Sequence, residues 1–260
     1  MKRIPRWIIG FSALVYFFLH VPIAVLAVFS FNDSKYSVEW KGFTWRWYER
    51  LLDRADILDA LQASLIVGGA STLIATVLGT LLALGLARGG FRGAGAIESS
   101  IYLPVVTPEI VFGISLLVMF SATSIELGLA TIIIAHVAFN ISFVAILVRA
   151  RLEGMDRSLE EAALILGADE WTTFWRITVP QLWPAIVSGA LLAFTMSFDD
   201  YVITSMVAGP GSTTLPITIY SMVRRTVEPS INALSTILLL GTSLVIFAAD
   251  WLGRRGQLAS

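Results

Sequence analysis

The chain has 260 residues, of which 56% are hydrophobic and 14% charged, and its mean hydropathy is +0.78. Soluble domains carry about 25% charged residues, so this composition excludes an ordinary soluble domain and indicates a protein whose side chains are solvated mainly by a lipid bilayer. The net charge of −1 argues against a nucleic-acid partner, and the absence of cysteine excludes disulfides, thiolate metal sites and cysteine nucleophiles.

Six stretches are long and apolar enough to cross a membrane as helices, since a span needs about 20 mostly apolar residues. The sequence therefore predicts an all-α integral membrane protein with one domain, residues 1–260. The first stretch follows three basic residues, as a signal peptide would, but it is too long for the apolar part of one, and a retained span is predicted. The six predicted spans are 7–29, 61–87, 101–122, 127–148, 183–207 and 231–251.

Basic residues are distributed unequally between the segments that connect these spans. If both termini lie in the cytoplasm, eleven of the 18 Lys and Arg residues fall in cytoplasmic segments and seven in external ones. This is the bias that the positive-inside rule describes. It predicts cytoplasmic termini and places the polar segment 149–182 in the cytoplasm.

The first external segment, 30–60, is rich in aromatic residues. Aromatic rings at this level usually form a belt at the membrane surface. The alternative is that Trp47 and Tyr48 face a vestibule and meet a cation through their ring faces. Near the other end of the chain, the turn signal Gly209-Pro210-Gly211 is followed by a predicted short helix over 215–225.

Three acidic residues lie within predicted spans, where a carboxylate costs a few kcal/mol even on lenient insertion scales. Glu109 follows Pro108 in the third span, and Asp199 and Asp200 interrupt the fifth; no Lys or Arg lies in any span to neutralise them. One interpretation is a helix cap for Glu109 and a solvated span end for the aspartates. The other is a passage for an organic cation, lined also by Tyr201, because the run after the aspartates stays apolar.

Three further polar residues in predicted spans are weaker candidates for the same passage. His20 precedes a proline in the first span, and His136 and Asn140 share one helix face at a spacing of four residues. Polar side chains in spans commonly bond neighbouring helices. We therefore expect these three to be hydrogen-bond partners between helices.

The polar segment after the fourth span has the pattern of two short helices. Ser158-Leu159-Glu160-Glu161 has the form of a capping box, in which the serine hydroxyl and Glu161 satisfy each other's backbone N–H groups. Gly167 suits a left-handed C-cap for this helix. Asp169 is expected to cap a second helix that stops before Pro180. On pattern alone this predicts an exposed helical hairpin.

The spacing in this hairpin resembles the signature loop of the membrane subunits of ABC importers. That loop reads Glu-Ala-Ala, three residues, Gly, nine residues and Ile-x-Leu-Pro, and the chain matches it except that Val179 stands where Leu is usual. The resemblance implies a type I ABC importer permease fold, in which the loop forms a cytoplasmic coupling helix that docks on a separate ATPase. The residues that carry the match are Glu161, Ala162, Ala163, Gly167, Ile177 and Pro180.

Other segments resemble the spermidine/putrescine permeases, in particular the second of the two permeases in such systems. This implies a heterodimer with a homologous permease, two ATPase subunits that bind ATP and Mg, and an external substrate-binding protein, in a bacterial inner membrane. It also implies that Glu109, Asp199 and Trp47 line the passage, whereas His20 departs from the aromatic Tyr common at its position. The matching segments are 30–35, 42–48, 199–203, 208–211 and 228–234.

The predicted function is the import of a polyamine or similar organic cation by alternating access. Two alternatives stay open: import of another amine-bearing solute, and transport by an ATP-independent secondary transporter, although repeated halves typical of that class are not visible. The chain has no Gly-Lys pair for a phosphate loop and no His-Glu-x-x-His metal motif. We therefore expect a transporter subunit rather than an enzyme, with no catalytic residues, no metal site and no cofactor in this chain.

Overall fold

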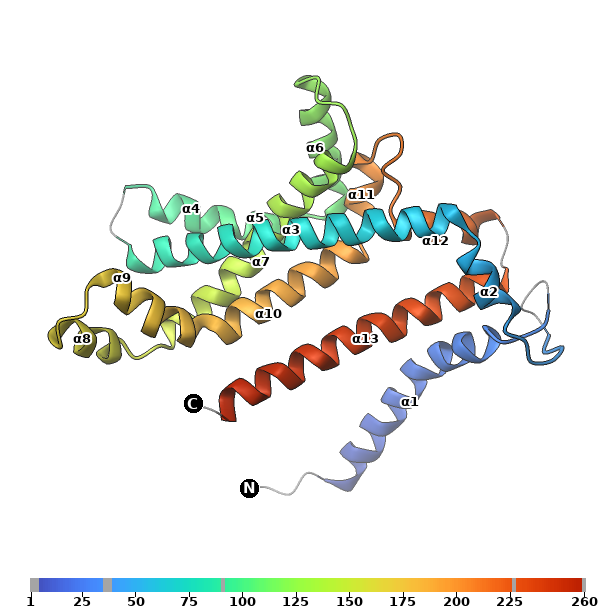
Figure 1. Ribbon diagram of the computed structural model, residues 1–260, viewed down its shortest axis with the longest axis horizontal. Coiled ribbons are helices and arrows are strands. Elements are labelled where there is room, and N and C mark those ends of the chain that lie inside the picture. Colours follow the sequence, from blue (N-terminus) through green and yellow to red (C-terminus); the bar gives the residue numbers. More distant parts are fainter. Residues whose placement is uncertain (1–4, 35–38, 90–91, 226–227, 259–260) are drawn as a thin grey trace. The chain divides into compact units, whose positions relative to one another are not determined.

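The computed structural model describes residues 5–34, 39–89, 92–225 and 228–258. These residues form helices and loops (Figure 1), and the β-structure among them is an isolated bridge between Asn32 and Phe43. This confirms the predicted all-α class. The chain divides into two compact units, one formed by residues 1–58 with 218–248 and the other by 59–217 with 249–260.

Four helical segments in the described part of the chain are long and apolar enough to cross a membrane, and each overlaps a predicted span. The last of them is a continuous run in which α9, η1 and α10 follow one another. The segments are α1 (Arg6–Phe29), α3 (Ala55–Arg88), α7 (Leu129–Glu153) and the run of α9 (Glu170–Thr173), η1 (Phe174–Thr178) and α10 (Val179–Phe198).

The predicted third span, 101–122, is broken rather than straight. The axis bends by 112° between the segments Ala94–Val106 and Glu109–Ala122, so that together they count as one broken span or a re-entrant loop. The bend occurs where Thr107 adopts an extended backbone before Pro108, because a residue that precedes proline is driven out of the helical region. The helices are α4 (Ala94–Ile101), α5 (Leu103–Val106) and α6 (Glu109–Ala122).

The predicted fifth span is interrupted where the aspartates stand, since α10 ends at Phe198 and α11 (Val202–Val207) follows. The short helix expected over 215–225 is α12 (Leu215–Arg225), and the sixth predicted span lies within α13 (Pro229–Leu258). The described apolar part of α13, Pro229–Leu244, is shorter than a full span. The count of six spans therefore stays a prediction.

The second unit is held together by apolar side chains between α3, α6, α7, α10 and α11. One buried cluster joins α3, α6, α7 and α11, and a second joins α3, α7 and α10. Both include residues of α7, which is the most deeply packed of the candidate spans. The two clusters are Val67, Phe120, Ile132, Ala135, Phe139, Ile203 and Val207, and Ala83, Leu84, Val144, Val148, Leu182 and Ala193.

Substituting Gly79 by alanine is expected to destabilise the packing of α3 on α7. The added Cβ would lie 2.8 Å from the Cβ of Val144 and 2.9 Å from the carbonyl oxygen of Ile141, which cannot rotate away. Overpacking of this kind typically costs about 1–3 kcal/mol. Thermal unfolding in detergent should show a lower midpoint for Gly79→Ala.

The matched control is Gly85→Ala on the same helix, where an added Cβ meets nothing within 4 Å. This substitution should keep or raise the unfolding midpoint, since alanine favours a helix over glycine by about 1 kcal/mol. Equal losses in the two variants would show that close approach of α3 and α7 is not what requires Gly79.

Candidate functional site

The break between α10 and α11 is a capped helix start, built on Asp200. Its Oδ1 accepts a hydrogen bond from the Ile203 N–H at 3.3 Å, and its Oδ2 accepts from the N–H and the hydroxyl of Thr204, both at 2.7 Å. The N–H groups at the start of a helix have no partner within the helix, and a carboxylate there satisfies them. Asp200 therefore fixes the geometry of the break.

His136 of α7 connects this cap to α10 and α11, and only 2% of its surface is exposed. Its Nε2 lies 3.0 Å from the Thr204 hydroxyl and 3.3 Å from Oδ2 of Asp200, and its Nδ1 lies 2.6 Å from the Ser197 hydroxyl. Because Thr204 donates its proton to Asp200, its oxygen accepts from Nε2, so that Nε2 carries a proton. Ser197 in turn lies 2.8 Å from the hydroxyl of Ser71 on α3. The expected role of His136 as a bond between helices is confirmed.

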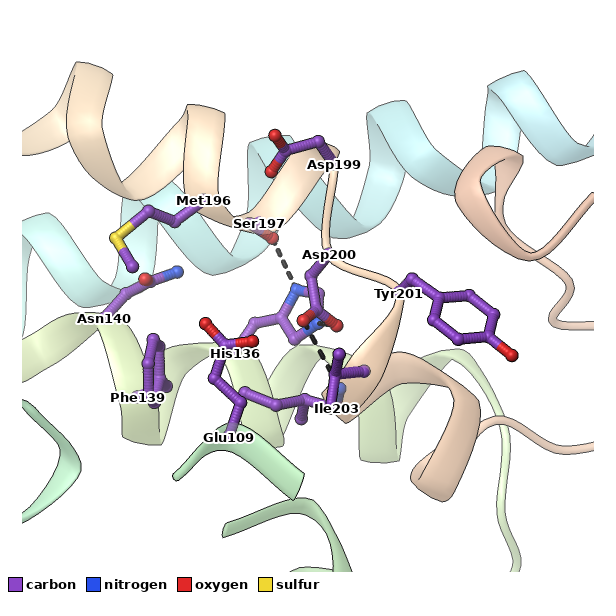
Figure 2. Close-up of a pocket in the computed structure, with 11 residues that line it drawn as sticks. Glu109, His136, Phe139, Asn140, Met196, Ser197, Asp199, Asp200, Tyr201 and Ile203 are labelled. Atoms are coloured by element: carbon purple, nitrogen blue, oxygen red, sulfur yellow. Dashed lines mark hydrogen bonds and ion pairs between the residues drawn. The ribbon is translucent and has the colours of Figure 1, made fainter. Parts of the chain in front are cut away.

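A pocket of about 260 Å³ lies beside this network (Figure 2). It gathers residues that are far apart in the sequence, from α6, α7, α10, the break and α11, and its lining residues include no Lys or Arg. Four of the predicted pathway residues meet here with the two polar residues of α7. They are Glu109, Asp199, Asp200 and Tyr201, with His136 and Asn140.

Two carboxylates at this pocket form no ion pair within the described part of the chain. Glu109 is the first residue of α6 and is exposed, and Asp199 is the C-cap of α10. Neither forms an ion pair with a described residue. The negative end of a helix dipole disfavours a carboxylate and favours a cation. A cation beside Asp199 is therefore attracted both by the carboxylate and by the C-terminal end of α10. In Figure 2 the carboxylates of Asp199 and Asp200 point in different directions, with Asp200 turned to its cap.

Trp47 and His20, the other predicted pathway residues, belong to the first unit and do not line the pocket. Trp47 is 3% exposed, and its Nε1–H donates to the carbonyl of Asn32 at 2.8 Å. The guanidinium groups of Arg46 and Arg50 lie 4.9 and 5.2 Å from its ring centroid. Trp47 thus anchors the segment 30–60, with its ring beside two guanidinium groups, and contact with a cargo stays a prediction.

His20 lies on α1 with its ring exposed. Its Nδ1 is 2.7 Å from the Tyr16 carbonyl oxygen, and its ring stacks on the ring of Tyr16 at 5.3 Å. These partners belong to its own helix rather than to another one. The expected bond from His20 to a neighbouring helix is therefore not seen among the described contacts.

The predicted helical hairpin is present, and its first helix is α8 (Ser158–Ile165). Gly167 has φ +92°, its N–H donates to the Leu164 carbonyl, and the Ala168 N–H donates to the Ala163 carbonyl, both at 3.0 Å. This pair of bonds is the Schellman motif, which requires a left-handed residue. The predicted C-cap at Gly167 is confirmed, and Asp169 takes the predicted N-cap position of α9.

The predicted capping box is wrong. Ser158 is the first residue of α8, and its N–H is bound by Oδ1 of Asp156 at 2.9 Å. The hydrogen bond from this N–H lowers the pKa of the Asp156 carboxyl. A carboxylate two residues upstream reaches the backbone more readily than a hydroxyl within the helix. Glu160, rather than Glu161, forms the side-chain contact, because the hydroxyl of Thr178 donates to it and ties α8 to η1.

The prediction that the second helix stops before Pro180 is wrong. The helix continues through the proline into the candidate membrane span. A π-helical turn, η1, precedes the proline, and Pro180 lies in the first turn of α10. Proline lacks an N–H and removes a bond from a continuous helix, and a local π turn is one way in which such a helix accommodates it. The second helix of the hairpin is therefore continuous with α10.

The hairpin tip exposes large apolar side chains. Ile165 is 85% exposed, Leu166 is 87% exposed and Trp171 is 69% exposed. Large exposed apolar side chains on a polar segment are typical of an interaction surface. Of the six motif residues, Glu161, Ala162, Gly167 and Pro180 are exposed, while Ala163 and Ile177 are half-buried.

Comparison with known proteins identifies this architecture. The family model described as "Binding-protein-dependent transport system inner membrane component" matches residues 75–255. The spermidine/putrescine transport system permease protein PotC of Escherichia coli (strain K12) is 40% identical over 245 residues, 94% of this chain and 93% of the relative. The putrescine transport system permease protein PotI of the same strain is 42% identical over 258 residues, 96% of this chain and 92% of the relative.

A solved structure shares the fold. The crystal structure of a bacterial ABC transporter involved in the import of the acidic polysaccharide alginate contains a chain that is 18% identical, with a TM-score of 0.76 over 96% of this chain and 94% of that one. At this identity the likeness shows the fold, which confirms the predicted importer permease fold. The relatives are permease proteins, which confirms a multi-pass transporter subunit rather than an enzyme. The chain belongs to the family of inner membrane components of binding-protein-dependent transport systems.

Proposed function

We propose that this chain is one membrane subunit of an ATP-driven importer for polyamines such as spermidine and putrescine. The observation that carries the proposal is the pocket beside the broken fifth span. Its spare polar groups are all acceptors: the carboxylates of Glu109 and Asp199, which have no cationic partner among the described residues, and Oδ1 of Asn140. A ligand that complements them carries positive charge and several N–H donors, as alkylammonium groups do.

The electrostatic gain at this pocket is large enough to select a cation. An ammonium about 4 Å from one carboxylate gains on the order of 4 kcal/mol at an effective dielectric near 20. Desolvation offsets much of this, and about 1–3 kcal/mol remains for each carboxylate. The names of the two relatives, both of which concern putrescine, support a polyamine over other amine-bearing solutes.

The proposed partners follow from the hairpin and the family. The exposed apolar tip of α8 docks on one of two ATPase subunits, which bind ATP and Mg; this chain itself holds no cofactor. A second, homologous permease completes the passage, and an external binding protein delivers the amine. The name of the family supports the binding protein, and the exposure of Ile165 and Leu166 supports the ATPase contact.

In this mechanism the hairpin passes motion from the ATPase to the spans. Because η1 joins α9 to α10 without a loop, a displacement of α8 moves α10 directly. The break at Asp200 lies at the far end of the same helix, so the movement opens or closes the pocket. The cargo then leaves Asp199 and Glu109 toward the cytoplasm.

The test is uptake of labelled putrescine, spermidine and a neutral diol of equal length into proteoliposomes that hold the complete transport system. We expect uptake of the amines, and we expect this uptake to require ATP on the ATPase side of the membrane and the binding protein on the opposite side. Uptake that persists without ATP would contradict the proposal and favour a secondary transporter, whereas ATP-dependent uptake of a different amine would correct only the substrate.

Topology provides a second test. We expect reporters fused after Glu153 and at Ser260 to be active as cytoplasmic fusions and a reporter at Gly211 to be active as an external one, because the basic residues are concentrated in the segments assigned to the cytoplasm. A cytoplasmic signal at Gly211 would contradict the six-span arrangement with both termini inside.

A further inference from the structure

Asn140 lies on α7, one helical turn after His136, and lines the pocket with 1% of its surface exposed. Its Nδ2 donates to the carbonyl oxygen of Ala193 on α10 at 3.3 Å. This contact fixes the orientation of the amide, because the reversed amide would set its own oxygen against that carbonyl oxygen. The Oδ1 atom therefore lies on the side of the amide away from Ala193.

This oxygen is buried and has no hydrogen-bond partner within the described residues. An unpaired buried acceptor is costly, so a native structure supplies a partner from outside the chain where it can. The other buried polar groups at the pocket differ in this respect: both ring nitrogens of His136 are bonded, and Asp200 accepts from the start of α11. Asn140 and Glu109 both line the pocket (Figure 2).

We infer that Oδ1 of Asn140 accepts an N–H hydrogen bond from an ammonium group of the cargo. The inference deepens the proposed function and rests on it. The carboxylates of Glu109 and Asp199 respond to charge, whereas a neutral amide oxygen responds to the presence and direction of an N–H group. Asn140 is thus the specificity-determining residue that distinguishes an amine with N–H groups from a cation without them.

The test compares Asn140→Asp with Asn140→Leu. Both substitutions remove the hydrogen bond to Ala193 and are close to asparagine in size, but only aspartate keeps an acceptor oxygen at the pocket. Uptake of radiolabelled putrescine is measured in cells whose own copy of this chain carries each substitution, with rates normalised to the amount of chain in the membrane. We expect Asn140→Leu to lose about tenfold in the normalised rate, as for a lost hydrogen bond to a charged donor, and Asn140→Asp to stay clearly above it.

If the role of Asn140 is purely structural, the uptake rates of the two variants should fall by the same factor. That result would overturn the inference. Wild-type uptake by Asn140→Leu would overturn it too, while leaving the proposed function intact. If the leucine variant does not accumulate, Asn140→Ser and Asn140→Ala replace the pair, since serine alone keeps an acceptor, and equal rates for these two overturn the inference. Ser142→Ala is the matched control, because Ser142 is buried on the same helix and does not line the pocket.

The same cells separate failure of the inference from failure of the proposed function. If the unsubstituted chain supports no uptake of putrescine or spermidine, both fall. As a further readout, excess hexamethyl-putrescine, which has the charge but no N–H group, should compete poorly with putrescine in the unsubstituted chain. It should compete relatively better in Asn140→Leu, and competition that is the same in both would contradict the role given to the amide oxygen.

Discussion

Replacing Gly167 by valine is expected to stop uptake while the chain still inserts into the membrane. Gly167 has φ +92° and no neighbour within 4 Å of a built Cβ, so the obstacle is the backbone conformation and not space. A left-handed residue with a Cβ costs about 1–2 kcal/mol, and a β-branched side chain is worse. An eight-residue helix such as α8 has little stability of its own. Loss of its Schellman cap should therefore disorder the surface that we propose to dock on the ATPase.

Amine uptake and co-purification of the ATPase measure this effect together. The matched control is Gly167→Asn, since asparagine is the residue other than glycine that most readily adopts the left-handed conformation. This control should keep most of the uptake. Normal uptake by Gly167→Val with the ATPase bound would show that the hairpin does not act as the coupling element.

The pair of substitutions Glu109→Gln and Asp199→Asn should have the next largest effect. Each keeps the size and hydrogen bonding of the side chain and removes one charge from a pocket that has no Lys or Arg in its lining. With about 1–3 kcal/mol for each carboxylate, each single substitution should lower uptake by about 5- to 150-fold, and the double variant should be lower than either.

The rates are compared in proteoliposomes with the same amount of complex. Glu126→Gln, an exposed acid that does not line the pocket, is the matched control and should leave uptake unchanged. The affinity of the external binding protein for the amine should be the same throughout, because none of these residues belongs to it. Wild-type rates in both single variants would mean that the carboxylates are structural.

The helical hairpin could be predicted well because its signals are local. A glycine at the end of a short helical pattern specifies its own C-cap, and Asp169 specifies the next helix start. The capping box failed because the helix begins one residue earlier than the pattern indicates: Ser158 is its first residue, and the carboxylate of Asp156 binds the Ser158 N–H. The stop before Pro180 failed because a single proline does not show whether a π turn precedes it.

The pocket could be predicted only in part. The carboxylates stood out because the membrane makes an unpaired charge costly, and the structure brings Glu109, Asp199 and Asp200 to one pocket. Their different roles could not be predicted, since the carboxylate of Asp200 accepts hydrogen bonds from the backbone of α11, whereas Asp199, the residue before it, forms no ion pair with a described residue. The free oxygen of Asn140 depends on a carbonyl 53 residues away, a pairing that no local pattern encodes.

The central claim, that a cation passes through the acidic pocket, is tested most directly by cysteine accessibility, because the chain has no native cysteine. Met196→Cys places a thiol at the pocket, and Ile134→Cys places one on an exposed part of α7 that does not line it. In the complete transport system, the account predicts that a cationic methanethiosulfonate modifies the thiol at position 196 faster than an anionic one does. It also predicts that putrescine protects that thiol during turnover but not the thiol at position 134. Equal rates with both reagents and no protection by putrescine at position 196 would contradict the account.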